Sequence, residues 1–201
     1  DMPIDGNVWL EDPLNSSYPP SIAFKAAQIQ DNEKAILMLR VLKEMVFLEK
    51  KNITKWEHLE TAATKVGLNI SEFKADYEGN AAALFNADLE VGRQLGVRGF
   101  PTLFFTNKSG QTEMIYGTKP YDTYENALLK LNPKATKTNY DKTWSSVFSK
   151  FSSLTAKEFA VLTETDRTES EKILNDLTQQ GYLEIYSTKN GAIWKLKNSS
   201  L

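Results

Sequence analysis

Positions 96–105 carry the sequence GVRGFPTLFF, which gives the clearest indication of the architecture. Two glycines and Pro101 form a turn that enters an apolar, β-rich run at 102–106. Turn-forming residues at 107–110 and a second β-rich run at 112–116 follow. An amphipathic pattern over 121–131 then predicts a closing helix. These segments together predict an α/β unit.

The residues before this unit have helical patterns. Ser17 is expected to cap a first helix, and a longer helix is expected over about 32–50. Thr54 with Glu57 predicts a capping box for the next helix. Further helices are expected at about 71–79 and 81–95. The segment before Ser17 has turn-forming composition and is predicted to be extended. Five helices are therefore expected between Ser17 and the first clear strand.

The residues after the unit indicate a linker and a second compact region. Residues 132–143 are polar, contain a proline and lack periodicity, which favours a linker. Three helical patterns follow, and two open on capping-box pairs: Thr155 with Glu158, and Thr168 with Glu171. An Asn-Gly turn at 190–191 joins two strands, at 183–187 and 192–196. Three helices and a hairpin are typical of a winged helix.

Composition excludes several classes of function for these 201 residues. They contain no cysteine and one histidine, His58, so no thiolate chemistry and no two-histidine metal site is expected. The formal net charge of −2 argues against strong non-specific binding to nucleic acid. No apolar run approaches the length of about 20 residues that a membrane span requires.

No catalytic constellation stands out. The acidic pairs Asp88 with Glu90 and Glu164 with Asp166 are better explained as solvated charges of helices and loops. A DNA-binding role for the winged-helix-like region is also disfavoured. Its candidate recognition helix, 168–176, is acidic where it would enter the major groove, and Lys189 and Lys195 offer few phosphate contacts. This region is therefore interpreted as a protein-contact module or a structural cap.

The stretch at 96–105 resembles the cis-proline loop of the thioredoxin superfamily. The resemblance implies a cis bond before Pro101, against the alternative of a trans proline at the start of a strand. The earlier helices resemble the helical insertion of DsbA-like proteins, on the residues Asp12-Pro13, Ser16-Ser17, Ala23, Lys25 to Gln28 and Asn52 to Thr54.

Within that group the chain is most similar to the YjbH family, also called SpxH. The similarity covers nearly the whole chain and rests on the order and spacing of short matches: WLEDP at 9–13, FLE at 47–49, Asn52-Ile53, Gly117, PYD at 120–122 and the C-terminal region. It implies a DsbA-like thioredoxin domain at 1–131, a linker at 132–143 and a winged-helix-like domain at 144–201. The first domain would comprise a helical insertion at about 17–95, the cis-proline loop and sheet at 96–117, and a closing helix at 121–131.

The resemblance implies a function in which the protein catalyses no reaction. Proteins of this family are adaptors that bind the transcription regulator Spx and promote its degradation by the ClpXP protease. A cytoplasmic adaptor is therefore expected, which is not an enzyme and has no cofactor, metal, nucleic-acid or membrane partner. The alternative is a DsbA-type thiol–disulfide oxidoreductase. Its cysteines would lie in a missing N-terminal strand–helix–strand, since the chain begins where that unit should have ended.

The expected partner-binding residues form the loop itself: Val97, Arg98, Gly99, Phe100 and Pro101. For Phe100, an exposed contact and a place in the core are both left open. Trp9 and the loop from Asp12 to Tyr18 are additional candidates through the family resemblance alone. The aromatic residues Phe47, Trp56, Phe104 and Phe105 are expected to pack in the interior.

Overall fold

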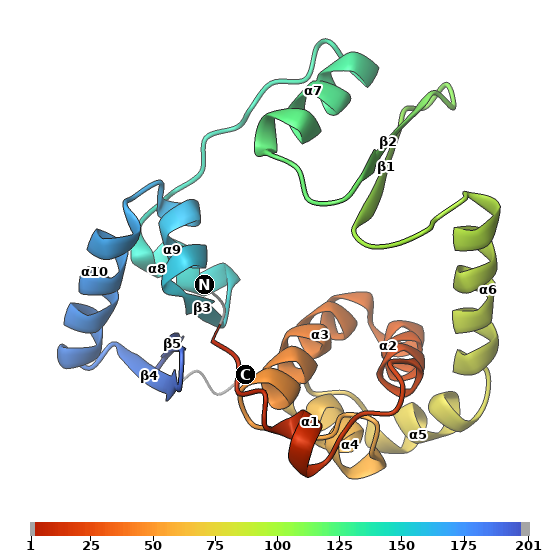
Figure 1. The fold of residues 1–201 in the computed structure, drawn as a ribbon, viewed down its shortest axis with the longest axis horizontal. Helices are drawn as coiled ribbons and strands as arrows, with labels where there is room; N and C mark the ends of the chain where they lie inside the picture. Colours follow the sequence, from red (N-terminus) through yellow and green to blue (C-terminus); the bar gives the residue numbers. More distant parts are fainter. Residues whose placement is uncertain (1–2, 198–201) are drawn as a thin grey trace. The chain divides into compact units, whose positions relative to one another are not determined.

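The computed structural model describes residues 3–197. Its helices and strands are labelled in Figure 1. The chain divides into two compact units. The first unit is drawn from residues 1–85 and 141–201, and the second from residues 86–140. The domain division inferred from the sequence, with its linker at 132–143, stays a prediction.

Helices make up the first half of the first unit. They are α1 (Val8–Glu11), α2 (Tyr18–Gln30), α3 (Asn32–Phe47), α4 (Trp56–Lys65), α5 (Ile70–Glu78) and the start of α6 (Ala81–Gln94). Small residues on α2, among them Ala23 and Ala27, are fully buried. They let neighbouring helices approach closely, and Met38, Leu59 and Phe73 fill the space around them. The core of this half therefore combines a small-residue helix face with larger side chains from its neighbours.

Two predictions for the N-terminal helices were wrong, and a third was correct only in the position of the cap. The segment over Val8–Glu11 is a short helix, although extended structure was predicted. Ser17 occupies the N-cap position of α2, as predicted, but its side chain makes no capping hydrogen bond. The box of Thr54 and Glu57 does not form: the amide and hydroxyl of Thr54 donate to Asn52 Oδ1 at 3.0 and 2.6 Å. The helix that follows begins only at Trp56.

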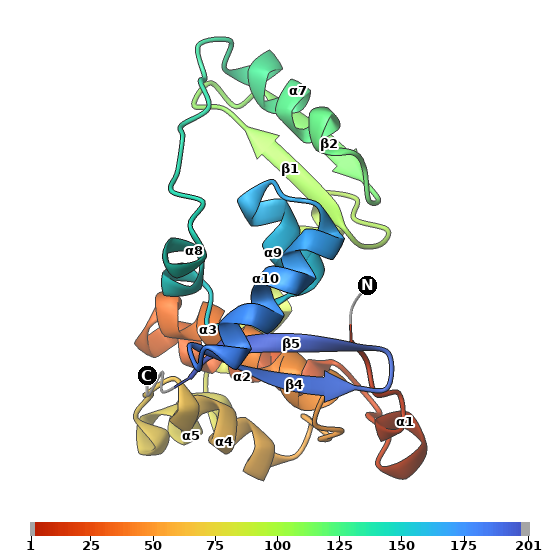
Figure 2. The same ribbon diagram turned by 90° about the vertical axis from the view of Figure 1, so that its left-hand side faces the viewer.

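The second half of the first unit combines helices with an antiparallel sheet. Its elements are α8 (Trp144–Lys150), β3 (Ser153–Thr155), α9 (Ala156–Thr163), α10 (Arg167–Gln179), β4 (Leu183–Thr188) and β5 (Gly191–Leu196). The strand order is β3-β5-β4, and Figure 2 shows the long β4–β5 hairpin. Phe159, Leu174 and Trp194 are buried in a core of their own. The predicted hairpin is confirmed, whereas β3 was not predicted; the winged-helix assignment stays a prediction.

The two predicted capping boxes of this region had different outcomes. Thr155 and Glu158 form the expected box at the start of α9. Thr168 does not cap α10, because Asp166 lies two residues earlier and accepts from the amides of Thr168 and Glu169. A carboxylate at the N-cap satisfies free amide donors of the first turn and also interacts favourably with the helix dipole.

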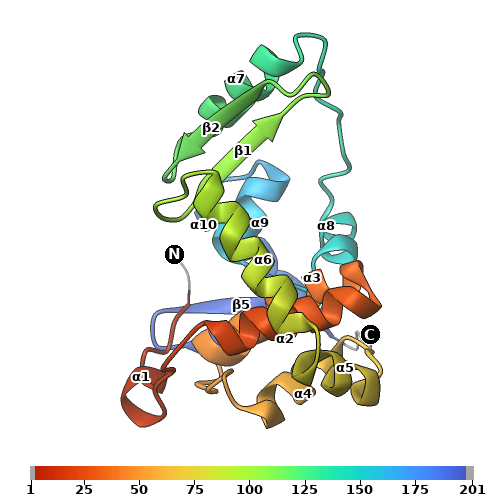
Figure 3. The ribbon, with the colours of Figure 1, turned by 90° about the vertical axis from the view of Figure 1, so that its right-hand side faces the viewer.

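The second unit contains the remainder of α6, β1 (Thr102–Thr106), β2 (Thr112–Tyr116) and α7 (Tyr121–Leu131). The strands pair antiparallel with Leu103 opposite Ile115, and α7 packs against both strands (Figure 3). Ile115 and Ala127 are buried between the hairpin and this helix. The order of loop, strand, turn, strand and helix predicted from the sequence is confirmed. Over residues 3–197, no helix is long and apolar enough to cross a membrane.

Candidate partner-binding surface

The loop 97–101 begins where α6 ends. Gly96 has a φ of 71°, a left-handed conformation that glycine adopts without steric cost. Its amide donates to the carbonyl of Arg93, and the amide of Val97 donates to the carbonyl of Gly92 at 2.9 Å. These bonds close the last turn of the helix and redirect the chain. The five predicted site residues therefore lie on one turn between a helix and a strand.

The far end of the loop is fixed to the hairpin. The hydroxyl of Thr102 donates to the carbonyl of Gly99 at 2.7 Å, and the amide of Gly117 donates to the carbonyl of Pro101 at 2.8 Å. The bond between Phe100 and Pro101 is cis, as predicted. A Cβ on Gly99 would lie 2.9 Å from the hydroxyl oxygen of Tyr116, so only glycine fits there without displacing that ring.

The anchored loop projects its apolar side chain into solvent. Phe100 is 91% exposed, which decides between the two possibilities left open by the sequence. Arg98 and Pro101 are also exposed, whereas Val97 and Gly99 are half-buried. A fixed backbone that carries an exposed aromatic ring has the form of a protein contact, because little entropy is lost when it binds. The partner-binding role of the five residues stays a prediction.

The hairpin adds an apolar face that was not predicted from the sequence. Alternation along β2 turns Ile115 toward α7 and leaves Met114 and Tyr116 each 56% exposed. Phe104 lies opposite Met114 in the register, and Thr102 lies opposite Tyr116. The period-two pattern of residues 112–116 contained this information, but both faces of the segment carry large side chains.

The other predicted candidates belong to the first unit. Trp9 is 46% exposed and stacks on Phe47 with ring centroids 5.8 Å apart. Asp12 forms an ion pair with Lys55 at 2.8 Å. The hydrogen bond from Lys55 lowers the pKa of the Asp12 carboxyl below its ordinary value. These contacts tie the start of the chain to α3 and α4.

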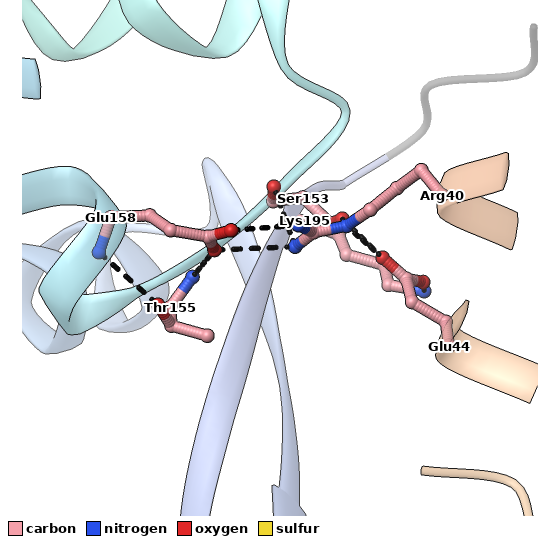
Figure 4. Close-up of polar contacts among 6 residues, drawn as sticks. All are labelled: Arg40, Glu44, Ser153, Thr155, Glu158 and Lys195. Carbon is pink, nitrogen blue, oxygen red and sulfur yellow. Dashed lines mark hydrogen bonds and ion pairs between the residues drawn. The ribbon is translucent and has the colours of Figure 1, made fainter. Parts of the chain in front are cut away.

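A polar cluster that the sequence did not reveal lies in the first unit (Figure 4). Arg40 on α3 donates to Glu44 on the same helix, at 2.9 Å, and to Glu158 on α9, at 2.8 Å. Lys195 on β5 donates to Glu44 at 2.6 Å, and the hydroxyl of Ser153 also donates to this carboxylate. The cluster therefore joins the helical half of the unit to α9 and the sheet.

Burial and pairing act in opposite directions on the charges of this cluster. Burial alone would raise the pKa of Glu44, but hydrogen bonds from Lys195 and Ser153 outweigh it and lower the pKa. Burial would likewise raise the pKa of Glu158, and hydrogen bonds from Arg40 and the Thr155 amide lower it. Both carboxylates are therefore held ionised, which suits a structural joint better than proton transfer.

The remaining titratable candidates have structural roles. Asp166 caps α10, while Glu164 forms an ion pair with Lys142 at 2.6 Å. Glu90 pairs with Arg93 along α6 at 2.9 Å. His58 contacts the carbonyl oxygen of Asn52 through Nδ1 at 2.7 Å. Over residues 3–197, no group of three or more histidine, aspartate or glutamate side chains is arranged to hold a metal ion.

Comparison with known proteins shows which family this chain belongs to. A family model described as thioredoxin matches residues 1–126. The ClpXP adapter protein SpxH of Halalkalibacterium halodurans is 34% identical over 197 residues, covering 96% of this chain and 64% of the relative. The protein of the same name from Bacillus subtilis is 31% identical over 199 residues, covering 96% and 67%. The chain thus spans about two thirds of the length of these relatives.

A solved structure agrees at the level of the fold. A putative protein disulfide isomerase from Nitrosomonas europaea aligns with a TM-score of 0.54 at 19% identity. The alignment covers 64% of this chain and 62% of that protein. At this identity the likeness concerns the fold alone, and it confirms the thioredoxin-like class predicted from the 96–105 stretch.

Proposed function

Because this chain belongs to the SpxH family of ClpXP adapter proteins and has a thioredoxin-like fold, we propose that it is a non-enzymatic adaptor. It binds the transcription regulator Spx and delivers it to the ClpXP protease. The work of an adaptor is to hold one protein where another can act on it. It requires a binding surface and no bond-making chemistry.

The observation that carries the proposal, beside family membership, is the exposure of Phe100 on an anchored loop. An aromatic side chain that is 91% exposed loses contact with water when a partner covers it, which favours association. The bonds from Thr102 and Gly117 hold the backbone of the loop in place before the partner arrives. The apolar face around Met114 and Tyr116 extends the contact area along the hairpin.

The oxidoreductase alternative needs a cysteine thiolate as its nucleophile. These 201 residues contain no cysteine. The exposed loop 97–101 is present in this chain without any cysteine, and its hydrogen bonds to the hairpin involve no thiol. Substrate holding is therefore the activity that the residues of this chain support.

Reconstituted proteolysis tests the proposal. Purified Spx is incubated with ClpX, ClpP and ATP, with or without this protein, and the loss of Spx is followed on gels. The protein is expected to accelerate degradation, and its affinity for Spx is measured by titration calorimetry. Phe100→Ser is expected to weaken Spx binding about tenfold, the cost of losing a central aromatic contact.

A matched variant separates a loss of contact from a general effect. Val91 lies on α6 and is 53% exposed, so Val91→Ser also removes an exposed apolar side chain. It is expected to leave Spx binding and degradation unchanged. Failure of the unsubstituted protein to bind Spx would contradict the proposed function. Equal losses from Phe100→Ser and Val91→Ser would contradict only the role of the loop.

A further inference from the structure

The loop 97–101 carries a positive charge beside its aromatic ring. Arg98 and Phe100 are both exposed, on either side of the half-buried Gly99. Because they are two positions apart, their Cα atoms are separated by about 7 Å at most. A partner that covers the ring of Phe100 therefore also comes within reach of the guanidinium of Arg98.

The charge of Arg98 is not neutralised within the protein. In the part of the chain that the structure describes, its guanidinium forms no hydrogen bond and no ion pair. Arg93, five positions earlier, differs because the carboxylate of Glu90 lies 2.9 Å from it. A guanidinium without such a partner is available to a carboxylate of another protein, which its planar fork holds through two parallel hydrogen bonds.

A second cation lies on the segment that is bonded to the loop. The amide of Gly117 donates to the carbonyl of Pro101 at 2.8 Å, which brings the residues after β2 against the loop. Lys119 follows two positions later, and its own amide donates to the hydroxyl of Tyr124 at 3.0 Å. Its side chain is exposed and has no partner among the described residues. Two cations on anchored backbone therefore lie at this end of the hairpin.

The carboxylates of the second unit are engaged with other groups. They form ion pairs with neighbouring cations, which are Glu90 with Arg93, Glu113 with Lys130, and Glu125 with Lys137. The charge of Asp122 also acts on Lys137, and Asp88 has an interaction of its own. Residues 86–140 contain seven basic and five acidic side chains, so this unit has a net charge of +2 in a chain whose net charge is −2. Its charge therefore complements an acidic partner.

We propose that the loop 97–101 recognises an acidic segment of its partner, in which an apolar side chain lies beside carboxylates. The apolar side chain covers Phe100, one carboxylate binds the guanidinium of Arg98, and another lies near Lys119. Arg98 thus selects the partner by charge and speeds its association. The inference rests on the proposed function, because it names the chemistry of the partner at that same site. Nucleic acid fits less well, since two cations beside an apolar ring supply few phosphate contacts.

Charge reversal with a matched control tests the role of Arg98. Arg98→Glu is expected to weaken Spx binding at least about tenfold at low salt, and the difference is expected to shrink as salt is added. Lys108 is also exposed and without a partner among the described residues, but it lies in the turn at the opposite end of the hairpin. Lys108→Glu changes the net charge equally and is expected to weaken binding less than about twofold. Equal losses would overturn the proposal.

Graded substitutions separate recognition from a structural role. Arg98→Lys keeps the charge without the planar fork and is expected to weaken Spx binding about two- to fivefold. Arg98→Gln removes the charge and is expected to fall between Arg98→Lys and Arg98→Glu. The midpoint of thermal unfolding is expected to stay unchanged in all three variants, because Arg98 has no partner within the described chain. Losses of affinity that follow the unfolding midpoint instead of the charge would overturn the proposal.

Synthetic peptides make the test independent of Spx. A fluorescein-labelled peptide GDEFLDEG is compared with GSSFLSSG by fluorescence anisotropy. The acidic peptide is expected to bind at least about tenfold more tightly, and Arg98→Glu is expected to abolish this preference. Equal affinity for the two peptides would overturn the inference even if Spx binds. The expected preference in a protein that does not bind Spx would support the inference and contradict the proposed function. Tighter, Arg98-dependent binding of oligothymidylate would overturn the inference in favour of nucleic acid.

Discussion

Lys195 on β5 donates a hydrogen bond of 2.6 Å to Glu44 on α3, across 151 positions of sequence. The carboxylate is only 13% exposed and is also bonded by Arg40 and Ser153. The helical half of the first unit is thus joined to the sheet through a charge that has several donors. This joint is polar, although each half has an apolar core of its own.

Glu44→Gln is expected to destabilise the protein by about 1–3 kcal/mol, because Arg40 and Lys195 lose the charge that compensates them. Urea unfolding followed by circular dichroism measures the change. Glu78→Gln is the control, since Glu78 lies 3.9 Å from Lys74 in an exposed pair. That substitution is expected to cost less than about 0.5 kcal/mol. Equal costs for the two variants would contradict a special role for the cluster.

The same carboxylates predict a dependence of stability on pH. The pKa values of Glu44 and Glu158 are lowered in the folded protein from an ordinary value of 4.5. The unfolded chain therefore binds more protons, so this contribution is present above the ordinary value and is lost as pH falls through the lowered pKa values. The free energy of unfolding is expected to decline below pH 4.5.

The control for this prediction is the double variant Glu44→Gln, Glu158→Gln. It is less stable at neutral pH, and its free energy of unfolding is expected to fall less steeply as pH decreases. Urea titrations of both proteins at matched pH values give the two slopes. Parallel slopes would assign the acid sensitivity to other carboxylates.

The close approach of Gly99 and Tyr116 predicts that substitutions at these two positions have non-additive effects on stability. The Cβ of Gly99→Ala would approach the Tyr116 hydroxyl oxygen to 2.9 Å, but the ring is half-exposed and free to shift. The cost in stability is therefore expected to be about 1 kcal/mol or less. In a Tyr116→Phe background that oxygen is absent, and Gly99→Ala is expected to cost nothing measurable. A double-mutant cycle from thermal unfolding gives the interaction energy, and additivity would contradict the predicted contact.

Removal of residues 141–201 tests whether the C-terminal region forms one unit with the N-terminal helices or a separate domain. It deprives Arg40 of Glu158 and Ser153, and Glu44 of Lys195. The remaining helices are expected to unfold at a lower urea concentration, which the fluorescence of Trp9 and Trp56 reports. An unchanged midpoint would instead support the sequence-based prediction that the region from 144 onward is a separate domain.

Local signals in the sequence predicted the elements whose stabilising contacts are close in sequence. The box of Thr155 and Glu158 joins residues three positions apart, and it formed as predicted. The same signal failed at Thr54, because Asn52 had already engaged its donors. Strand β3 escaped prediction, because three residues give no periodicity and their partners lie on β5, about forty residues further on.

The candidate functional residues also differ in how far local sequence signals predicted them. The loop 97–101 was located from its own residues, since glycine and proline report backbone geometry directly. The exposure of Phe100 depends on what packs around it, and only the structure supplied that. The polar cluster brings together residues more than a hundred positions apart, for which no local pattern exists.

The distance in sequence between Arg40 or Glu44 and their partners has a consequence for biosynthesis. Their partners on β3, α9 and β5 emerge from the ribosome 109 to 151 residues later. At a synthesis rate of about 5–20 residues per second, the interval lasts roughly 5–30 s. The whole second unit is translated during that time. During this interval Arg40 and Glu44 have only each other as partners within the cluster. The nascent helices therefore lack the contacts that later join them to α9 and the sheet, and at this stage the newborn chain is open to chaperones and proteases.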